Sequence, residues 1–194
     1  MRTFIHRFTE PLDIIYDPFA GSGTTIDACK FMYRRFIVSD LTPDKSKEEI
    51  IKHDIKDELP NNLPRPNLVF LDPPYWKQAQ GKYSDSKNDL GNMSLEDFYS
   101  AIRNFLKKII TKKPDRIAIL IQNTQYANEN HEVEPHNYKL YNEVTKYKYD
   151  FEYEYILPYS TQQYLPQQVI VMKEKNRDLQ VHRHLLIYRR NKKK

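Results

Sequence analysis

Four aspartates follow apolar runs in the first half of the chain, and their placement could build a ligand site. Asp17, Asp40, Asp54 and Asp72 each stand at or near the end of a candidate strand. In an open parallel sheet, the carboxyl ends of the strands line the crevice that holds a ligand. Because carboxylates are costly to bury without partners, four of them along one rim indicate a binding site. A set of solvated loop acids is the alternative at each single position, most of all at Asp54.

A glycine loop lies between the first candidate strand and the first candidate helix. It carries two of the four glycines of the chain, Gly21 and Gly23, and such a loop lets a ligand approach backbone N–H groups. A phosphate-binding P-loop would need a lysine that is missing here, and a dinucleotide fingerprint would need a third glycine where Ile26 stands. Asp40, about 20 residues further on, is placed to bind the hydroxyls of a ribose. A tight turn without a ligand is the alternative.

The elements that must position these residues alternate along the chain. Strands are predicted over 13–19, 35–41, 50–55, 67–76 and 116–123. Helices are predicted over 24–35 and 94–113, the second with a capping box formed by Ser94 and Asp97. In the last third, 151–160 and 184–190 are strand candidates that we expect to pair in antiparallel fashion and close the sheet. This order predicts a single α/β domain over residues 1–194 with a mostly parallel sheet.

The net charge of +5 is concentrated at the C-terminal end. Residues 189–194 hold five positive charges, and the rest of the chain has as many basic as acidic residues. We predict a flexible basic tail over 189–194, which is either a nucleic-acid-binding arm or a solubilising end. The sequence shows no membrane-spanning run and no signal segment, and its single cysteine, Cys29, excludes an internal disulfide. A cytoplasmic protein without membrane contact is therefore expected.

Two motifs together resemble the S-adenosylmethionine-dependent amino methyltransferases that modify adenine N6 or cytosine N4 in DNA. DPFAGSGTT (17–25) resembles their cofactor motif F-x-G-x-G, and DPPYW (72–76) resembles their catalytic motif D/N/S-P-P-Y/F/W. The resemblance spans roughly residues 13–123. It implies a Rossmann-like class I methyltransferase fold, with a mostly parallel seven-stranded sheet and an antiparallel C-terminal strand pair. It also implies S-adenosyl-L-methionine as cofactor and a role in DNA methylation of the restriction-modification type.

The resemblance assigns roles to individual residues. Phe19, Gly21 and Gly23 would hold the methionine end of the cofactor, Asp40 its ribose and Asp54 its adenine. Asp17 and Thr24 complete the predicted cofactor site. The predicted catalytic residues are Asp72, Pro73, Pro74 and Tyr75, and the predicted substrate contacts are Trp76, Lys77, Tyr159 and Tyr164. For Tyr159 and Tyr164, which would form an aromatic wall, ordinary hairpin packing is an equal alternative.

The catalytic motif suits methylation of an amino group whose lone pair is delocalised into a base. The Asp72 side chain and the Pro73 backbone carbonyl would accept hydrogen bonds from the two N–H groups of this amino group. Its lone pair would then turn towards the methyl donor. The two prolines stiffen the segment, and Tyr75 would stack on a base flipped out of the duplex. We expect direct displacement without a covalent enzyme intermediate, because Cys29 lies on the apolar face of its helix as a core thiol. Asp in the first motif position favours adenine N6.

Several points leave the function open. The family carries a further cofactor helix and a target-recognition domain, whereas only 16 residues precede Asp17 here. DNA is the expected partner, and a second copy of the chain or a separate specificity partner would supply recognition. No metal is predicted, since His131 and His136 lack a second ligand pair. An RNA base methyltransferase and a non-catalytic binding module are the alternatives, although the intact motif 72–75 argues against the second.

Overall fold

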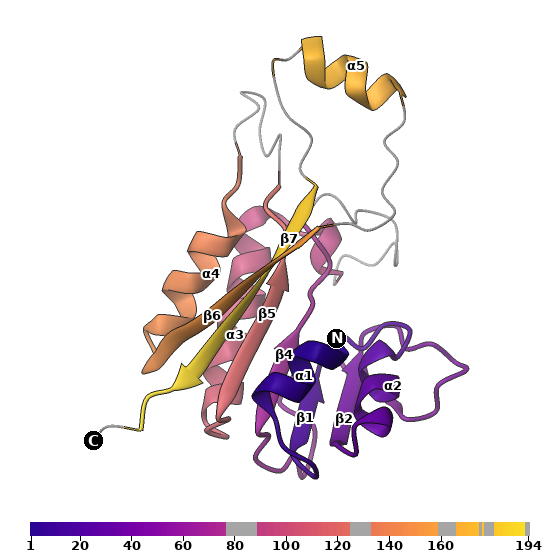
Figure 1. Cartoon of the computed structure of the whole chain (residues 1–194), viewed down its shortest axis with the longest axis vertical. Coiled ribbons are helices and arrows are strands. Elements are labelled where there is room, and N and C mark those ends of the chain that lie inside the picture. The colour runs from indigo at the N-terminus through magenta and orange to yellow at the C-terminus, as the bar shows by residue number, and fades with distance from the viewer. Residues whose placement is uncertain (77–88, 125–132, 159–165, 175, 177–180, 193–194) are drawn as a thin grey trace.

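A computed structural model describes residues 1–76, 89–124, 133–158, 166–174, 176 and 181–192. A seven-stranded sheet with the order β3-β2-β1-β4-β5-β7-β6 forms its centre (Figure 1). The strands are β1 (Ile14–Asp17), β2 (Arg35–Asp40), β3 (Ile50–Lys52), β4 (Leu68–Leu71), β5 (Arg116–Ile121), β6 (Tyr149–Pro158) and β7 (His182–Arg190). The helices are α1 (Arg2–Phe8), α2 (Thr24–Phe31), the 3-10 helix η1 (Leu90–Asn92), α3 (Leu95–Ile110), α4 (His136–Thr145) and α5 (Pro166–Glu174).

The pairing of the strands confirms the predicted fold. β3, β2, β1, β4 and β5 pair in parallel. β7 then runs antiparallel to both β5 and β6, so the C-terminal pair closes one edge of the sheet. Because β7 is antiparallel, its first residues lie at the same end of the sheet as the carboxyl ends of the parallel strands.

Helices cover both faces of the sheet. Val69, Leu71 and neighbouring side chains pack in one core cluster with α3 and α4, whereas Leu68 and Phe70 pack in another with α1 and α2. This split follows from the alternation of side chains along a strand. The central strand β4 is buried along its whole length, as expected for a parallel sheet covered on both faces.

Several element boundaries differ from those predicted. The helix expected over 24–35 ends at Phe31, because Tyr33 adopts a left-handed conformation with a φ of 58°. The strand expected over 67–76 ends at Leu71, before the two prolines, which cannot donate to a ladder. The third strand spans three residues, and the last begins at His182. The helices α1, α4 and α5 were not predicted. None of the described helices is long and apolar enough to cross a bilayer.

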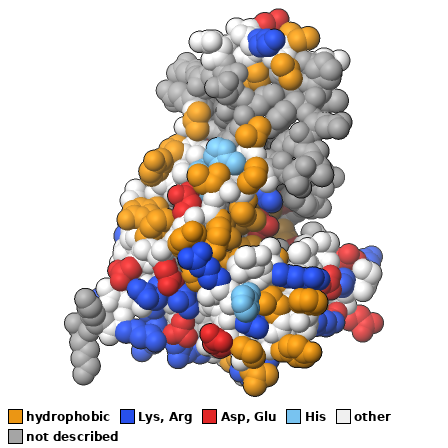
Figure 2. Space-filling model, in the orientation of Figure 1, with side chains coloured by type: hydrophobic (Ala, Val, Ile, Leu, Met, Phe, Trp, Pro, Cys, Tyr) orange, Lys and Arg blue, Asp and Glu red, His pale blue; other side chains and the backbone are white. Residues whose placement is uncertain are grey.

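The prediction of a flexible tail over 189–194 is wrong in its extent. Arg189 and Arg190 belong to β7, where Arg189 stands opposite Arg116, the first residue of β5. Arg190 also contacts Asp115, at 3.4 Å. The chain therefore leaves the sheet at its amino end, where Figure 1 marks the C-terminus and Figure 2 shows acidic and basic side chains interspersed.

Candidate active site

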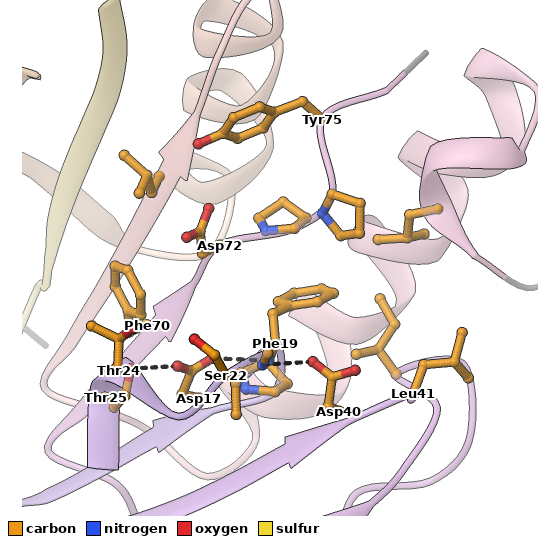
Figure 3. A pocket seen from close by; sticks show the side chains of 18 of the residues that line it. Asp17, Phe19, Ser22, Thr24, Thr25, Asp40, Leu41, Phe70, Asp72 and Tyr75 are labelled. Atoms are coloured by element: carbon orange, nitrogen blue, oxygen red, sulfur yellow. Dashed lines mark hydrogen bonds between the residues drawn. The ribbon is translucent and has the colours of Figure 1, made fainter. Parts of the chain in front are cut away.

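A cavity of about 820 Å³ opens at the carboxyl ends of the parallel strands. Its volume falls within the range of roughly 300–1,000 Å³ that is typical of ligand sites. Figure 3 shows several of its lining side chains, which come from the loops after β1, β2 and β4. Ten of the predicted site residues line it: Asp17, Phe19, Gly21, Thr24, Asp40, Asp54, Asp72, Pro73, Pro74 and Tyr75.

The two glycines of the loop after β1 have different roles. Gly21 has a φ of +50°, and a Cβ added to it would meet no atom within 4 Å. It therefore presents bare backbone to the cavity that it lines. Gly23, with a φ of +84°, caps α2, and an added Cβ would lie 3.2 Å from the Cδ1 of Ile26. Gly23 is not among the described residues that line the cavity, and the structure gives it a role in the turn; its predicted contact with the cofactor stays a prediction.

The Asp17 carboxylate accepts two hydrogen bonds that hold the glycine loop. Its Oδ1 accepts from the backbone N–H of Phe19 at 2.9 Å, and its Oδ2 accepts from the Thr25 hydroxyl at 2.5 Å. Burial raises the pKa of Asp17 to about 7, although these two hydrogen bonds oppose the shift; the charges of Asp72 and Asp40 add to it. A cation in the cavity would favour the ionised carboxylate.

Asp40, at the end of β2, accepts one hydrogen bond from the glycine loop and one from the loop that follows β2. Its Oδ2 accepts from the backbone N–H of Gly21 at 2.8 Å, and its Oδ1 accepts from that of Thr42 at 2.9 Å. Each carboxylate oxygen keeps a second lone pair, so Asp40 can still accept from a ligand. Asp54 lies two residues after β3 and forms an ion pair with Lys56 at 3.6 Å.

Asp72 follows the last residue of β4 and points into the same cavity (Figure 3). Burial raises its pKa to about 6, against the opposing effects of the positive charge of Arg183 and a hydrogen bond from the Tyr75 side chain. Arg183 lies near the start of β7 and lines the cavity. The sequence analysis missed Arg183; the signal was its position at the start of an antiparallel strand, which begins where the parallel strands end.

Trp76, a predicted substrate contact, is buried beside the cavity-lining segment 72–75. Its side chain is 4% exposed and packs in the core cluster with α3. Its indole Nε1 donates to the Met93 carbonyl at 2.9 Å, and it is not among the described residues that line the cavity. The chain turns after Tyr75, so the two neighbouring aromatic side chains occupy different environments. The other three predicted substrate contacts, Lys77, Tyr159 and Tyr164, lie outside the described residues.

The sequence analysis also missed the second wall of the cavity. α1 contributes Phe4, and the last three strands of the sheet contribute Leu120, Leu157 and Leu185. This wall is apolar and lies on the α1 and α2 face of the sheet. The cavity therefore joins a polar region at β1 and β2 to an apolar region at β5, β7 and β6.

Acidic groups dominate the charge of the cavity. Asp44 and Asp89 join the four predicted aspartates, whereas among the described residues the basic groups of the lining residues are the side chains of His53 and Arg183 and the amino group of Met1. No group of three His, Cys, Asp or Glu side chains in the described parts of the chain is arranged to hold a metal ion. The site is therefore suited to a ligand that carries positive charge.

Comparison with known families gives a match to part of the chain. The family described as DNA methylase (N6/N4 methyltransferases) matches residues 1–52. That stretch contains the glycine loop and Asp40, and the segment with Asp72 lies beyond it. No curated protein matches the sequence.

Solved structures resemble the chain over nearly its whole length. A 1,6-didemethyltoxoflavin-N1-methyltransferase from Burkholderia thailandensis, with bound 1,6-didemethyltoxoflavin and S-adenosylhomocysteine, has a TM-score of 0.57 and 11% identity over 97% of this chain and 75% of its own. A SAM-dependent methyltransferase from Archaeoglobus fulgidus has a TM-score of 0.55 and 14% identity over 97% of this chain and 92% of its own. A TehB-like SAM-dependent methyltransferase from Corynebacterium glutamicum has a TM-score of 0.55 and 10% identity over 98% and 86%.

The chain has the Rossmann-like fold of S-adenosylmethionine-dependent methyltransferases. This conclusion concerns the fold, because identities at this level carry no information about the substrate.

Proposed function

We propose that the protein is an S-adenosylmethionine-dependent methyltransferase that modifies an exocyclic amino group of a DNA base, adenine N6. One observation carries the proposal: the glycine loop, Asp40 and the Asp72-Pro73-Pro74-Tyr75 segment, which are far apart in sequence, open onto one cavity. The family match over residues 1–52 adds support, because that family is described as DNA methylase.

The residues of the cavity fit the cofactor. S-adenosylmethionine carries a sulfonium and an ammonium group, and both would meet an acid-rich lining. Gly21 offers bare backbone on the open side of its loop, and Asp40 keeps lone pairs for ribose hydroxyls. Asp54, on the loop after β3, would accept from the adenine amino group. When bound, the cofactor supplies an electrophilic methyl group.

Asp72 would act on the amino group that receives the methyl. Its carboxylate would accept a hydrogen bond from one N–H of the amino group, and the Pro73 carbonyl is the predicted acceptor for the other N–H. The lone pair would then be turned towards the methyl group. As the new N–C bond formed, the bond from the methyl carbon to sulfur would break and leave a neutral thioether, and the nitrogen would then give up one proton. With a pKa of about 6, Asp72 can take that proton and pass it to water. No covalent bond to the protein is needed, and Cys29 is buried and not among the described residues that line the cavity.

The apolar end of the cavity supports a base as the second ligand. Tyr75, Leu157 and Leu185 provide flat and aliphatic surface beside Asp72. A base extruded from a duplex needs such a pocket, because it exchanges stacking in the helix for contacts with the protein. Recognition of sequence would come from a second copy of the chain or from a specificity partner.

A transfer assay with labelled S-adenosylmethionine tests the proposal. Duplex DNA, single-stranded DNA and total RNA are offered separately, and the labelled nucleoside is identified. We expect N6-methyladenine in DNA. Label in N4-methylcytosine would change the target base, and label in RNA alone would replace DNA as substrate. If calorimetry showed cofactor binding but no substrate became labelled, the catalytic part of the proposal would be wrong.

A further inference from the structure

A buried hydrogen-bond network lies behind the segment 72–76, on the side away from the cavity. We propose that Thr124 and His136 are positioning residues that fix this segment for the reaction proposed above, on which this inference rests. Neither residue lines the cavity within the described parts of the chain. Both are buried, with exposed fractions of 2% and 0%.

The contact to the segment is made by Thr124. Its hydroxyl donates to the backbone carbonyl of Trp76 at 3.0 Å and lies 3.0 Å from the Nε2 of His136. A hydroxyl has a single proton, so once that proton goes to Trp76, Nε2 must be the donor in the second contact. The ring of His136 therefore lies directly against the hydroxyl that holds Trp76.

The two neighbours of His136 compete for its single ring proton. Burial lowers the pKa of His136 to about 4; the Glu134 charge opposes this and Lys139 adds to it, so the ring is neutral near pH 7. Its Nδ1 lies 2.7 Å from the Tyr99 hydroxyl. Tyr99 donates its single proton to the Glu134 carboxylate at 2.6 Å, so it can only accept from Nδ1. Lys139 contacts the same carboxylate oxygen at 2.6 Å.

The fold holds this network rigidly against the segment. Thr124 and Glu134 form an antiparallel bridge, with backbone hydrogen bonds of 3.2 and 2.8 Å in the two directions. His136 is the first residue of α4, and its ring lies edge-on to Trp76 at 6.1 Å. Side chains in close-packed interiors move together, so a change at Thr124 is transmitted to Trp76.

Trp76 is therefore fixed at two polar groups, its carbonyl by Thr124 and its indole by Met93. At the other end of the segment, Asp72 is fixed by its attachment to β4. Two prolines stiffen the residues between these ends. A displacement of Trp76 should consequently move Tyr75 and the carbonyl of Pro73, and with them the geometry of the amino group.

The fluorescence of Trp76 tests the positioning without any assay of catalysis, because Trp76 is the only tryptophan of the chain. Thr124→Val keeps the shape of the side chain and removes its hydroxyl. We expect a red-shifted emission and a higher acrylamide quenching rate. Thr9→Val is the matched control: the hydroxyl of Thr9 is also buried, donates to the Ile5 carbonyl at 2.6 Å and accepts from Arg34 at 3.1 Å. This variant should leave the emission of Trp76 unchanged.

Single-turnover kinetics connects the positioning to the reaction. Thr124→Val should lower the rate of methyl transfer by about 10- to 100-fold while cofactor affinity stays within about twofold. Thr124→Ser, which restores the hydroxyl, should recover most of the rate. His136→Gln keeps a hydrogen-bonding group near the Nε2 position beside Thr124 and should retain activity, whereas His136→Asn reaches only the Nδ1 position and should lose it.

The two readouts separate failure of this inference from failure of the proposed function. Unchanged Trp76 fluorescence in a folded Thr124→Val protein would overturn the positioning role, whatever the substrate is. A fluorescence change in a protein that methylates no nucleic acid would support the positioning and contradict the proposed function. Equal losses of rate in Thr124→Val and Thr9→Val would show a general loss of stability and overturn the inference.

Discussion

The two ends of the sheet both carry buried or half-buried carboxylates, but they satisfy them differently. At the amino end, Asp115 contacts Arg65 at 2.5 Å and lies within 4 Å of Arg190 and Lys192. Glu152 at the same end contacts Arg116 at 2.7 Å. At the carboxyl end, Asp17 and Asp40 accept from backbone N–H groups and a hydroxyl, and within the described residues no lysine or arginine forms an ion pair with either.

This difference shows which end is prepared for a ligand. Ion pairs at the amino end cancel the charge of the acids, so that end joins β5, β6 and β7 into one unit. Neutral donors orient Asp17 and Asp40 at the carboxyl end but leave their charge in place. Burial raises the pKa of Asp17 and of Asp72, and neighbouring acids add to the shift of Asp17, so the ionised forms of both carboxylates are penalised there. A cationic ligand would relieve the penalty.

The largest effect is expected at the carboxyl end from Asp72→Ala. Loss of the acceptor should lower methyl transfer by about 10²- to 10⁴-fold. Cofactor affinity should stay within about threefold, because the predicted cofactor contacts come from other strands. Rapid-quench transfer and calorimetry measure the two quantities. Asp44→Ala, which removes an exposed carboxylate from the same cavity, is the control. Full activity of Asp72→Ala would remove the segment 72–75 from the mechanism.

Asp40→Ala should affect binding and leave the chemical step intact. The variant loses an acceptor for the cofactor ribose and also releases the backbone N–H of Gly21. Hydrogen bonds to a charged group are worth about 1.5–3 kcal/mol, which corresponds to a loss of affinity of about 10- to 100-fold. Calorimetry with S-adenosylmethionine measures this. A transfer rate at saturating cofactor that fell as far as in Asp72→Ala would contradict the division of roles between the strands.

The pH dependence of methyl transfer tests the role of Arg183, whose positive charge lowers the pKa of Asp72 at the carboxyl end. The carboxylate is needed in its ionised form, so transfer should fall as the pH drops through the Asp72 pKa of about 6. One unit below that pKa the rate should be about tenfold lower. Arg183→Gln removes the charge that lowers this pKa, so the fall should begin at higher pH. A profile that is identical in wild type and Arg183→Gln would show that Asp72 does not control it.

The sequence predicted the parallel half of the molecule because its signals are local. Short apolar runs ending in aspartates placed four strands and one rim of the cavity, and the motifs placed the glycine loop and Asp72. Helix α4 was missed because polar residues interrupt its apolar positions, and Leu140 and Val144 are buried through contacts with distant parts of the chain, including β6 and β7.

What could not be predicted depends on contacts between distant residues. Gly23 and Trp76 belong to the motifs, but packing turns them away from the cavity. Residues 189–190 were predicted to be part of a tail because they are basic. They instead continue β7, where they form ion pairs with Glu152 and Asp115, which are remote in sequence. Arg183 likewise meets Asp72 only through the antiparallel direction of β7.

The smallest effect is expected at the amino end, and it tests whether that end takes part in binding nucleic acid. Arg189→Ala combined with Lys192→Ala removes two basic side chains that lie within 4 Å of Glu152 and Asp115. Because the cavity opens at the opposite end of the sheet, transfer should stay within about twofold of wild type, and the slope of log affinity against log salt should not change. If both side chains bound phosphates of duplex DNA, their removal would flatten that slope by about 0.9 for each phosphate, or about 2 in all.

The matched variant is Lys45→Ala with Lys47→Ala, on the loop between β2 and β3 that also contributes Asp44 to the cavity. Lys47 makes an ion pair with Asp27 at 3.2 Å, and this pair of lysines matches the amino-end pair in charge. The loop borders the cavity through Asp44, and we expect the salt slope to flatten here. If the slope instead flattened only in the Arg189 and Lys192 variant, phosphates would be held at the amino end, and the paired charges there would be a binding surface.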